Sequence, residues 1–158
     1  MVAFLNVSVF SRVQEVIAEA DLTKVLKPAV VILFGRMIKI KRVYEKIDVR
    51  DGERVLVDRM WPRGIRRSTS HIDIWIKNIG PSAELRKWYS HDPKKWVRFR
   101  ERYLAELKEN RAMNKLMQIV MNADPVTFVY SSRDEKRNNA VVLAGVVNRI
   151  LARQERRR

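Results

Sequence analysis

Two short apolar runs of the chain end in the same polar chemistry. Residues 55–57 and residues 126–130 are each followed, within a few positions, by arginine and aspartate. The side chains concerned are those of Asp58, Arg59, Arg63, Arg133 and Asp134. A guanidinium binds phosphate or carboxylate through two parallel hydrogen bonds, and a neighbouring aspartate either fixes the guanidinium or accepts a proton. The pattern predicts an anion-binding pocket, and an Arg–Asp ion-pair network that only ties loops to the sheet is the alternative.

His91 is a further candidate for acid–base chemistry, together with Asp58 and Asp134. It lies directly before Asp92 and Pro93, a pair that is typical of a helix start. A histidine at this place can titrate near neutrality and act as a general acid or base, whereas a merely exposed or hydrogen-bonded histidine is the competing interpretation. We interpret Asp92 as a helix cap rather than as a catalytic acid.

Aromatic and hydroxyl side chains complete the candidate site. Trp61 lies inside the polar loop after residues 55–57, where it can form a wall of the pocket. Ser131 follows the other apolar run, but no general base stands at a spacing that would mark a hydrolase triad. Trp75 and Trp96 occur at helical spacing among apolar residues, which favours core packing over base stacking.

The elements that must position these residues follow from hydrophobic periodicity. Short β-branched or aromatic runs predict buried strands at 55–57 and 126–130, and alternation of isoleucine with lysine predicts a half-buried strand over 38–44. Helical spacing predicts further elements at 9–26, 72–79, 82–88, 92–107, 113–121 and from about 135 to the carboxyl terminus. The apolar run 29–34 reads as one more short strand.

The order of these elements predicts an α/β fold. We expect one domain with a small, mainly parallel sheet flanked by helices, in which the carboxyl ends of adjacent strands form the ligand site. The segment 45–53 is short for a parallel crossover, so an antiparallel pairing of the first two of these strands, which gives a mixed sheet, is left open.

Composition limits the chemistry. The chain has no cysteine and only two histidines, which excludes disulfides and thiol nucleophiles and argues against a metal site, and no cofactor is expected. No apolar run approaches the ~20 residues of a membrane helix, so a cytoplasmic protein without membrane attachment is expected.

The 33 Lys and Arg against 18 Asp and Glu give a net charge of +15. Such a charge attracts polyanions such as nucleic acid, but it is also typical of lysine- and arginine-rich surfaces that serve stability.

Several ordered motifs resemble a known family. They are residues 54–64, Ser82 with 85–88, 91–93 with Trp96, Tyr130 with Arg133 and Asp134, and Asn138 with 140–143. Over residues 37–151 the chain is similar to the YeaO-like branch of domain-of-unknown-function family 488. The resemblance implies a small cytoplasmic α/β protein of bacteria or archaea with no established activity. Arg86 and Asn138 lie within these motifs and join Arg59, Trp61, Arg63, Ser131 and Arg133 as candidate ligand-binding residues.

The resemblance also carries two differences. A longer-chain branch of that family has a Cys-His-Arg motif after its last strand, whereas residues 133–138 here contain no cysteine, so thiol chemistry is not expected. Residues 1–36 lie outside the family pattern, which begins at Met37. We therefore expect an amino-terminal extension over 1–36, either an upstream in-frame reading or an added helix and strand, and an α/β domain over 37–158.

Two functions follow as hypotheses. The first is an enzyme or binding protein for a phosphate-bearing small molecule or nucleic-acid phosphate, with Asp58, His91 or Asp134 in acid–base roles. The second is a basic nucleic-acid-associated module in which the Arg–Asp cluster is architecture. The sequence specifies neither the reaction nor the oligomeric state.

Overall fold

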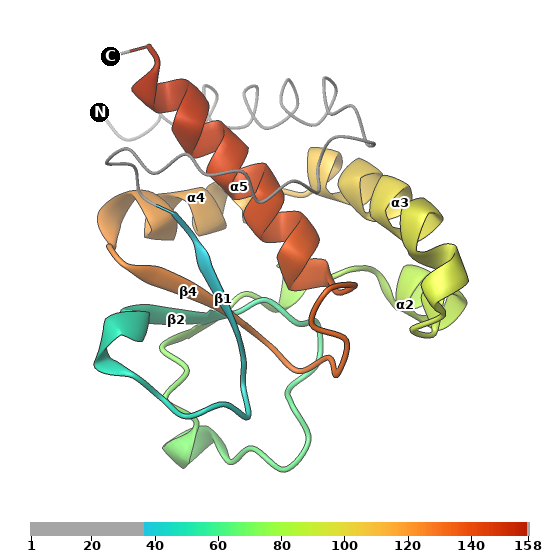
Figure 1. The fold of residues 1–158 in the computed structure, drawn as a ribbon, viewed down its shortest axis with the longest axis horizontal. Helices are drawn as coiled ribbons and strands as arrows, with labels where there is room; N and C mark the ends of the chain where they lie inside the picture. The colour runs from blue at the N-terminus through green and yellow to red at the C-terminus, as the bar shows by residue number, and fades with distance from the viewer. Residues whose placement is uncertain (1–36, 158) are drawn as a thin grey trace.

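The computed structural model describes residues 37–157, which form a four-stranded sheet and a set of helices (Figure 1). The strands are β1 (Lys39–Arg42), β2 (Glu53–Leu56), β3 (Ile74–Trp75) and β4 (Val126–Tyr130). Their order across the sheet is β1-β4-β2-β3, and every neighbouring pair is parallel. The expected α/β fold is thus confirmed, while the helix and strand predicted for 9–26 and 29–34 lie outside the described residues.

The mixed sheet that the sequence left open is not formed, because β1 and β2 are both parallel to β4, which lies between them. The connection over residues 43–52 can cross this central strand because the strands are only four or five residues long. A strand of that length rises about 15 Å, and a ten-residue segment can span about 33 Å. A 3-10 helix, η1 (Val49–Asp51), lies within this connection.

The α-helices follow the predicted periodicity. They are α2 (Ala83–Tyr89), α3 (Trp96–Glu109), α4 (Ala112–Asn122) and α5 (Asn139–Glu155), and short 3-10 helices are η2 (Arg67–Thr69), η3 (Lys77–Ile79) and η4 (Pro93–Lys95). Ser82 caps α2 by accepting a hydrogen bond from the amide of Leu85. Asp92 caps η4, which leads directly into α3, as the Asp-Pro pair predicts.

Two element predictions are wrong. The segment 72–79, predicted as a helical face, contains β3 followed by η3, because the amide of Ile76 bonds to the carbonyl of Leu56 and so continues the sheet. The last helix begins at Asn139 rather than near residue 135. Its start is delayed because Asp134 binds the amides of Lys136 and Arg137 in a turn.

The helices pack on one face of the sheet. Strand residues of a single parity, among them Val55, Val57 and Phe128, belong to the same buried cluster as the apolar stripes of α3, α4 and α5. Leu56 and Val129 are equally buried but lie outside that cluster, because alternate side chains point to the opposite face. In Figure 1 the helices lie on one side of the strands, and the connections from β1 to β2 and from β2 to β3 lie on the other.

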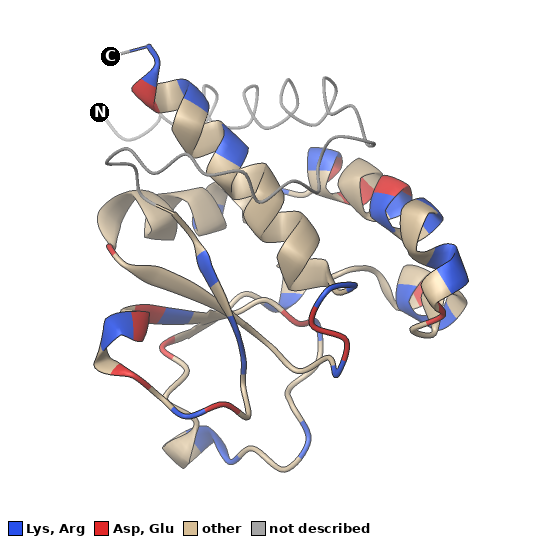
Figure 2. Ribbon diagram, in the orientation of Figure 1, with Lys and Arg blue, Asp and Glu red and all other residues tan. Residues whose placement is uncertain are grey.

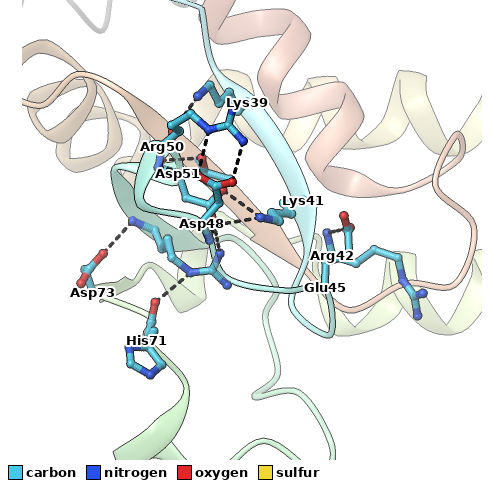
Figure 3. Close-up of polar contacts among 11 residues, drawn as sticks. Lys39, Lys41, Arg42, Glu45, Asp48, Arg50, Asp51, His71 and Asp73 are labelled. Atoms are coloured by element: carbon cyan, nitrogen blue, oxygen red, sulfur yellow. Dashed lines mark hydrogen bonds and ion pairs between the residues drawn. The ribbon is translucent and has the colours of Figure 1, made fainter.

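The loop-covered face contains a buried polar network (Figure 3). Arg54 donates from Nη1 to Asp51 Oδ2 and from Nε to the carbonyl of His71, and both members of the ion pair are buried. Lys41 Nζ lies 2.9 Å from Asp51 Oδ1, and the hydroxyl of Thr127 in β4 donates to the Asp51 carbonyl. The network fixes η1 against the sheet and thereby aligns the start of β2 with β4.

The tryptophans divide between the two sides. Trp96 belongs to the buried helical core, as its spacing predicts. Trp75 is partly buried in the edge strand β3, in register with the buried Leu56 on the loop-covered face, and lies outside the helical core. The helical spacing from which its packing was predicted is not present, because the segment forms a strand.

Candidate functional site

The candidate site lies at the carboxyl ends of β2 and β4. These strands are neighbours in parallel register, with Leu56 opposite Val129, and the amide of Val57 extends the ladder to the Val129 carbonyl. The loop after β2 begins at residue 57 and the loop after β4 at residue 131, so both loops leave the sheet at the same edge. The predicted convergence of the two polar segments is therefore present, while the functional roles of their residues remain predictions.

Asp58 joins the two loops to the first turn of α5. Its Oδ2 accepts hydrogen bonds from the amide of Ser131 at 2.8 Å and from the hydroxyl of Ser131 at 2.5 Å. Its Oδ1 lies 3.2 Å from Nδ2 of Asn139, which also donates to the Val57 carbonyl. The carboxylate thus accepts three hydrogen bonds from the fold itself.

The electrostatic environment of Asp58 favours its protonated form. Burial raises the pKa of Asp58 above its ordinary value, against the opposing effects of the Ser131 and Asn139 hydrogen bonds and of the Arg86 charge. The Arg86 side chain, from α2, has its Nε buried without a hydrogen-bond partner. We call Asp58, Arg86, Ser131 and Asn139 the strand-end cluster.

Asp134 has a different role in the geometry. Its Oδ1 accepts from the amides of Lys136 and Arg137, and its Oδ2 accepts from Nε of Arg137 at 2.8 Å. Burial works against ionisation here, but these hydrogen bonds prevail and hold the pKa of Asp134 below its ordinary value. Asp134 therefore shapes the loop after β4, and its carboxylate is occupied within that loop.

Asn138, a candidate ligand-binding residue, caps α5. Its side-chain oxygen accepts from the amide of Val141 at 3.0 Å, and its Nδ2 donates to the carbonyl of Asp134 at 2.8 Å. The side chain is buried, so both ends of its amide are used by the fold. Sequence reasoning missed the next residue, Asn139, although an asparagine opening a helix after a strand is a recognisable signal for this position.

The three arginines predicted to bind an anion belong to the two loops that leave this edge, and their guanidiniums have no internal partner. Arg63 and Arg133 are exposed and Arg59 is partly exposed. Within residues 37–157, the guanidiniums of these three strand-end arginines make no hydrogen bond, ion pair or ring contact. The carboxylates of the edge are thus occupied, whereas its strand-end arginines are not.

His91 and Trp61 lie at different parts of this region. His91 is exposed, has a positive φ of 56°, and places its ring 5.8 Å from that of Tyr89, whose hydroxyl donates to the Arg137 carbonyl. Trp61 donates from Nε1 to the Ile65 carbonyl and meets Trp75 edge to face. Arg67, which sequence reasoning did not single out, lies over both indoles.

Other kinds of site are not found in the described part of the chain. Residues 37–157 contain no group of three or more His, Asp or Glu side chains placed to hold a metal ion. In the same range, no helix has both the length and the apolar character needed to cross a bilayer.

Comparisons with known proteins place the chain among uncharacterised relatives. Residues 37–158 match the family model DUF488-N3i, described as the inactive DUF488-N3 subclade. The uncharacterised protein Rv3073c of Mycobacterium tuberculosis H37Rv is 43% identical over 111 residues, covering 70% of this chain and 93% of that protein. The uncharacterised protein YeaO of Escherichia coli K12 is 42% identical over 107 residues, covering 68% and 93%. No solved structure matches.

Proposed function

Because the chain belongs to the DUF488-N3i family, the inactive DUF488-N3 subclade, we propose that it acts by binding rather than by catalysis. The proposed ligand is a phosphate-bearing anion held at the carboxyl edge of β2 and β4. The relatives named above are uncharacterised, so the ligand class is argued from the residues of this chain alone.

The observation that carries the proposal is the contrast between acids and bases at this edge. Asp58 and Asp134 use their carboxylate oxygens within the fold. The strand-end arginines, Arg59, Arg63 and Arg133, have no described partner and two of them are exposed. A guanidinium that is not paired internally is free to bind a phosphate through two parallel hydrogen bonds.

Acid–base roles for Asp58, His91 and Asp134 remain a prediction from the sequence. Two observations favour binding over such chemistry. Both aspartates already accept several hydrogen bonds from the loops they organise, and the family description is that of an inactive subclade.

Nucleic acid is the second candidate for the phosphate-bearing partner. The net charge of +15 favours association with any polyanion. A polyanion attracted only by this charge would bind weakly and would be released steeply as salt rises, because counterion release supplies most of the affinity.

The first prediction compares charge at the edge with charge elsewhere. Calorimetric titration with inorganic pyrophosphate should show that R63A and R133A each weaken binding about tenfold or more. A charge-assisted hydrogen bond contributes about 1.5–3 kcal/mol, and 1.4 kcal/mol corresponds to a factor of ten. The loss should persist at high salt, since a bidentate contact is screened less than a distant charge.

The matched controls are R111A, at the residue directly before α4, and K115A, within α4. Both side chains are exposed and lack a described partner, as at Arg63 and Arg133. They should change the affinity for pyrophosphate far less. Equal losses from both pairs of variants, disappearing together as salt rises, would show that only the overall charge attracts the ligand.

A further inference from the structure

The loop between β2 and β3 is strongly basic. From Arg59 to Ile72 it contains Arg59, Arg63, Arg66 and Arg67 and no acidic residue. Arg63, Arg66 and Arg67 are all exposed. Asp58 and Asp73 flank this stretch, and between them all its charged positions are basic, in contrast to the mixed charges that Figure 2 shows on α3. A surface of this kind presents several cations along a path rather than at one point.

Two indoles accompany these arginines. The rings of Trp61 and Trp75 meet edge to face, with centroids 5.4 Å apart and planes 71° apart. Trp61 Nε1 donates to the Ile65 carbonyl at 2.7 Å and Trp75 Nε1 donates to the Asp58 carbonyl at 2.8 Å. Since each indole N–H is bound to backbone, both rings are fixed in orientation and offer only their apolar surface to further contacts.

The pair lies outside the helical core, and Trp75 is in register with the buried Leu56 on the loop-covered face. Trp96 lies within the buried cluster and Trp88 packs against it, whereas Trp61 and Trp75 belong to neither group. Both are only partly buried. Their position beside the strand-end cluster is set by the Trp75 bond to Asp58, the residue that joins the two loops.

Arg67 covers the indole pair from the solvent side. Its guanidinium carbon lies 4.7 Å from the ring centroid of Trp61 and 5.1 Å from that of Trp75. Within the described residues no carboxylate pairs with Arg67. The planar cation is therefore positioned by the aromatic rings while remaining exposed.

From this arrangement we infer that the phosphate-bearing ligand is a single-stranded nucleic acid, one of whose bases stacks on the Arg67 guanidinium above Trp61 and Trp75. The inference rests on the proposed function, because Arg63 and Arg66 then bind the adjoining phosphates. Arginine planes and aromatic rings are the surfaces on which proteins stack unpaired bases. In a duplex the base faces are already stacked, so this surface selects unpaired strands.

The test distinguishes affinity that comes from the bases of a strand from affinity that comes from its phosphates. Full-length protein is titrated, with fluorescence anisotropy as readout, into labelled oligothymidylate of about 12 nucleotides, within the usual footprint of single-strand binders. An abasic strand of the same length supplies the same phosphates without bases. We expect the thymidylate strand to bind about fivefold or more tightly than the abasic strand, and a blunt duplex to bind less tightly than the thymidylate strand. A parallel titration with labelled oligouridylate of the same length shows whether the protein binds RNA or DNA more tightly.

The decisive variant is R67K, with R66K as its matched control. Both retain the charge and both remove a planar guanidinium, but only Arg67 contacts the indoles. R67K should bring the ratio of thymidylate to abasic affinity close to one, whereas R66K should leave the ratio unchanged. W61L should lower the ratio of thymidylate to abasic affinity as R67K does, provided that its melting temperature is unchanged. If W61L unfolds, the comparison of R67K with R66K still tests the inference.

The outcomes distinguish this inference from the proposed function. Equal binding of thymidylate and abasic strands by the wild type, equal binding of duplex and single strand, or equal ratios in R67K and R66K would overturn base stacking and leave phosphate binding intact. Binding of pyrophosphate without binding of any oligonucleotide would do the same. Failure of pyrophosphate and every strand to bind would overturn both.

Discussion

Asp58 and Asp134 lie at the same edge of the sheet, yet the fold shifts their pKa values in opposite directions. Burial dominates at Asp58 and raises its pKa. At Asp134 the hydrogen bonds from the amides of Lys136 and Arg137 and from the Arg137 side chain overcome burial and lower it. The two carboxylates therefore contribute to stability with opposite dependence on pH, which gives a direct experimental check on their placement.

A D58N variant tests this difference at the residue scale. A raised pKa means that the folded state binds the proton more tightly than the unfolded state, so ionisation of Asp58 destabilises the fold. The free energy of unfolding of the wild type, minus that of D58N, should therefore fall as pH rises from below about 4, the unfolded pKa, through the folded pKa. Urea titrations across this range measure the difference.

D134N provides the control of opposite sign. Because the pKa of Asp134 is lowered, its stabilising effect is present above the unfolded pKa and is lost as pH falls through the folded pKa. The wild-type value minus that of D134N should therefore rise with pH. Parallel curves for wild type and D58N would show that Asp58 is not buried as described.

At the same scale, the sequence predicted that the two polar loops meet, but it did not predict the hydrogen bonds between them. Strand ends that carry Arg and Asp indicated that the loops would meet, because parallel neighbours share an edge. The specific bonds from Ser131 and Asn139 to Asp58 depend on the register of β2 and β4 and on where α5 begins, and neither follows from local pattern. The Arg67 contact with two indoles is equally non-local.

At the scale of elements, local chemistry predicted the starts and caps of α2 and η4 well, but not the start of α5. Ser82 and Asp92 cap as expected, because a cap depends only on residues within one turn. The edge strand β3 was missed because two residues are too few to show a period. The strand order was not predicted, since nothing near β1 or β2 in sequence specifies that β4 separates them.

Two glycines test how tightly the connections are held. Gly52 and Gly64 both have positive φ, 63° and 76°, but a Cβ at Gly52 would collide with the Pro125 carbonyl oxygen, whereas at Gly64 it meets open space. G64A should therefore lower the free energy of unfolding by about 1–2 kcal/mol, from backbone strain alone. G52A should lower it by about 1–3 kcal/mol more, because the start of β4 must shift.

Denaturant titration of both variants measures the two effects. The pair is informative because the substitution and the sign of φ are the same, whereas only at Gly52 would the new Cβ meet the Pro125 carbonyl. Equal destabilisation by G52A and G64A would contradict the close approach of the β1–β2 connection to Pro125.

At the scale of the whole molecule, the family pattern begins where the sequence analysis expects the α/β domain to begin. The family model matches residues 37–158. The relatives named above align over 93% of their own length with part of this chain. From the extent of these matches we propose that the α/β domain folds without residues 1–36.

A protein beginning at Met37 should therefore be soluble and unfold in one cooperative transition. Calorimetry and denaturant titration measure its melting temperature and the cooperativity of its unfolding, with the full-length protein as the reference. A soluble product with a similar melting temperature is expected, because the described residues by themselves form a buried cluster of strand and helix side chains. Aggregation would instead show that the extension supplies apolar surface, with Val13, Val16 and Ile17 as the first residues to examine.

The central position of β4 has a consequence for synthesis on the ribosome. β1 and β2 emerge early, but each forms its parallel ladder with β4, whose residues follow β2 by some 70 positions. Until that strand is translated, the nascent chain has two strands without their shared partner, and long-range pairing of this kind is slow and exposed to aggregation. The sheet can therefore be completed only after β4 has been translated, and until then β1 and β2 lack the strand that lies between them.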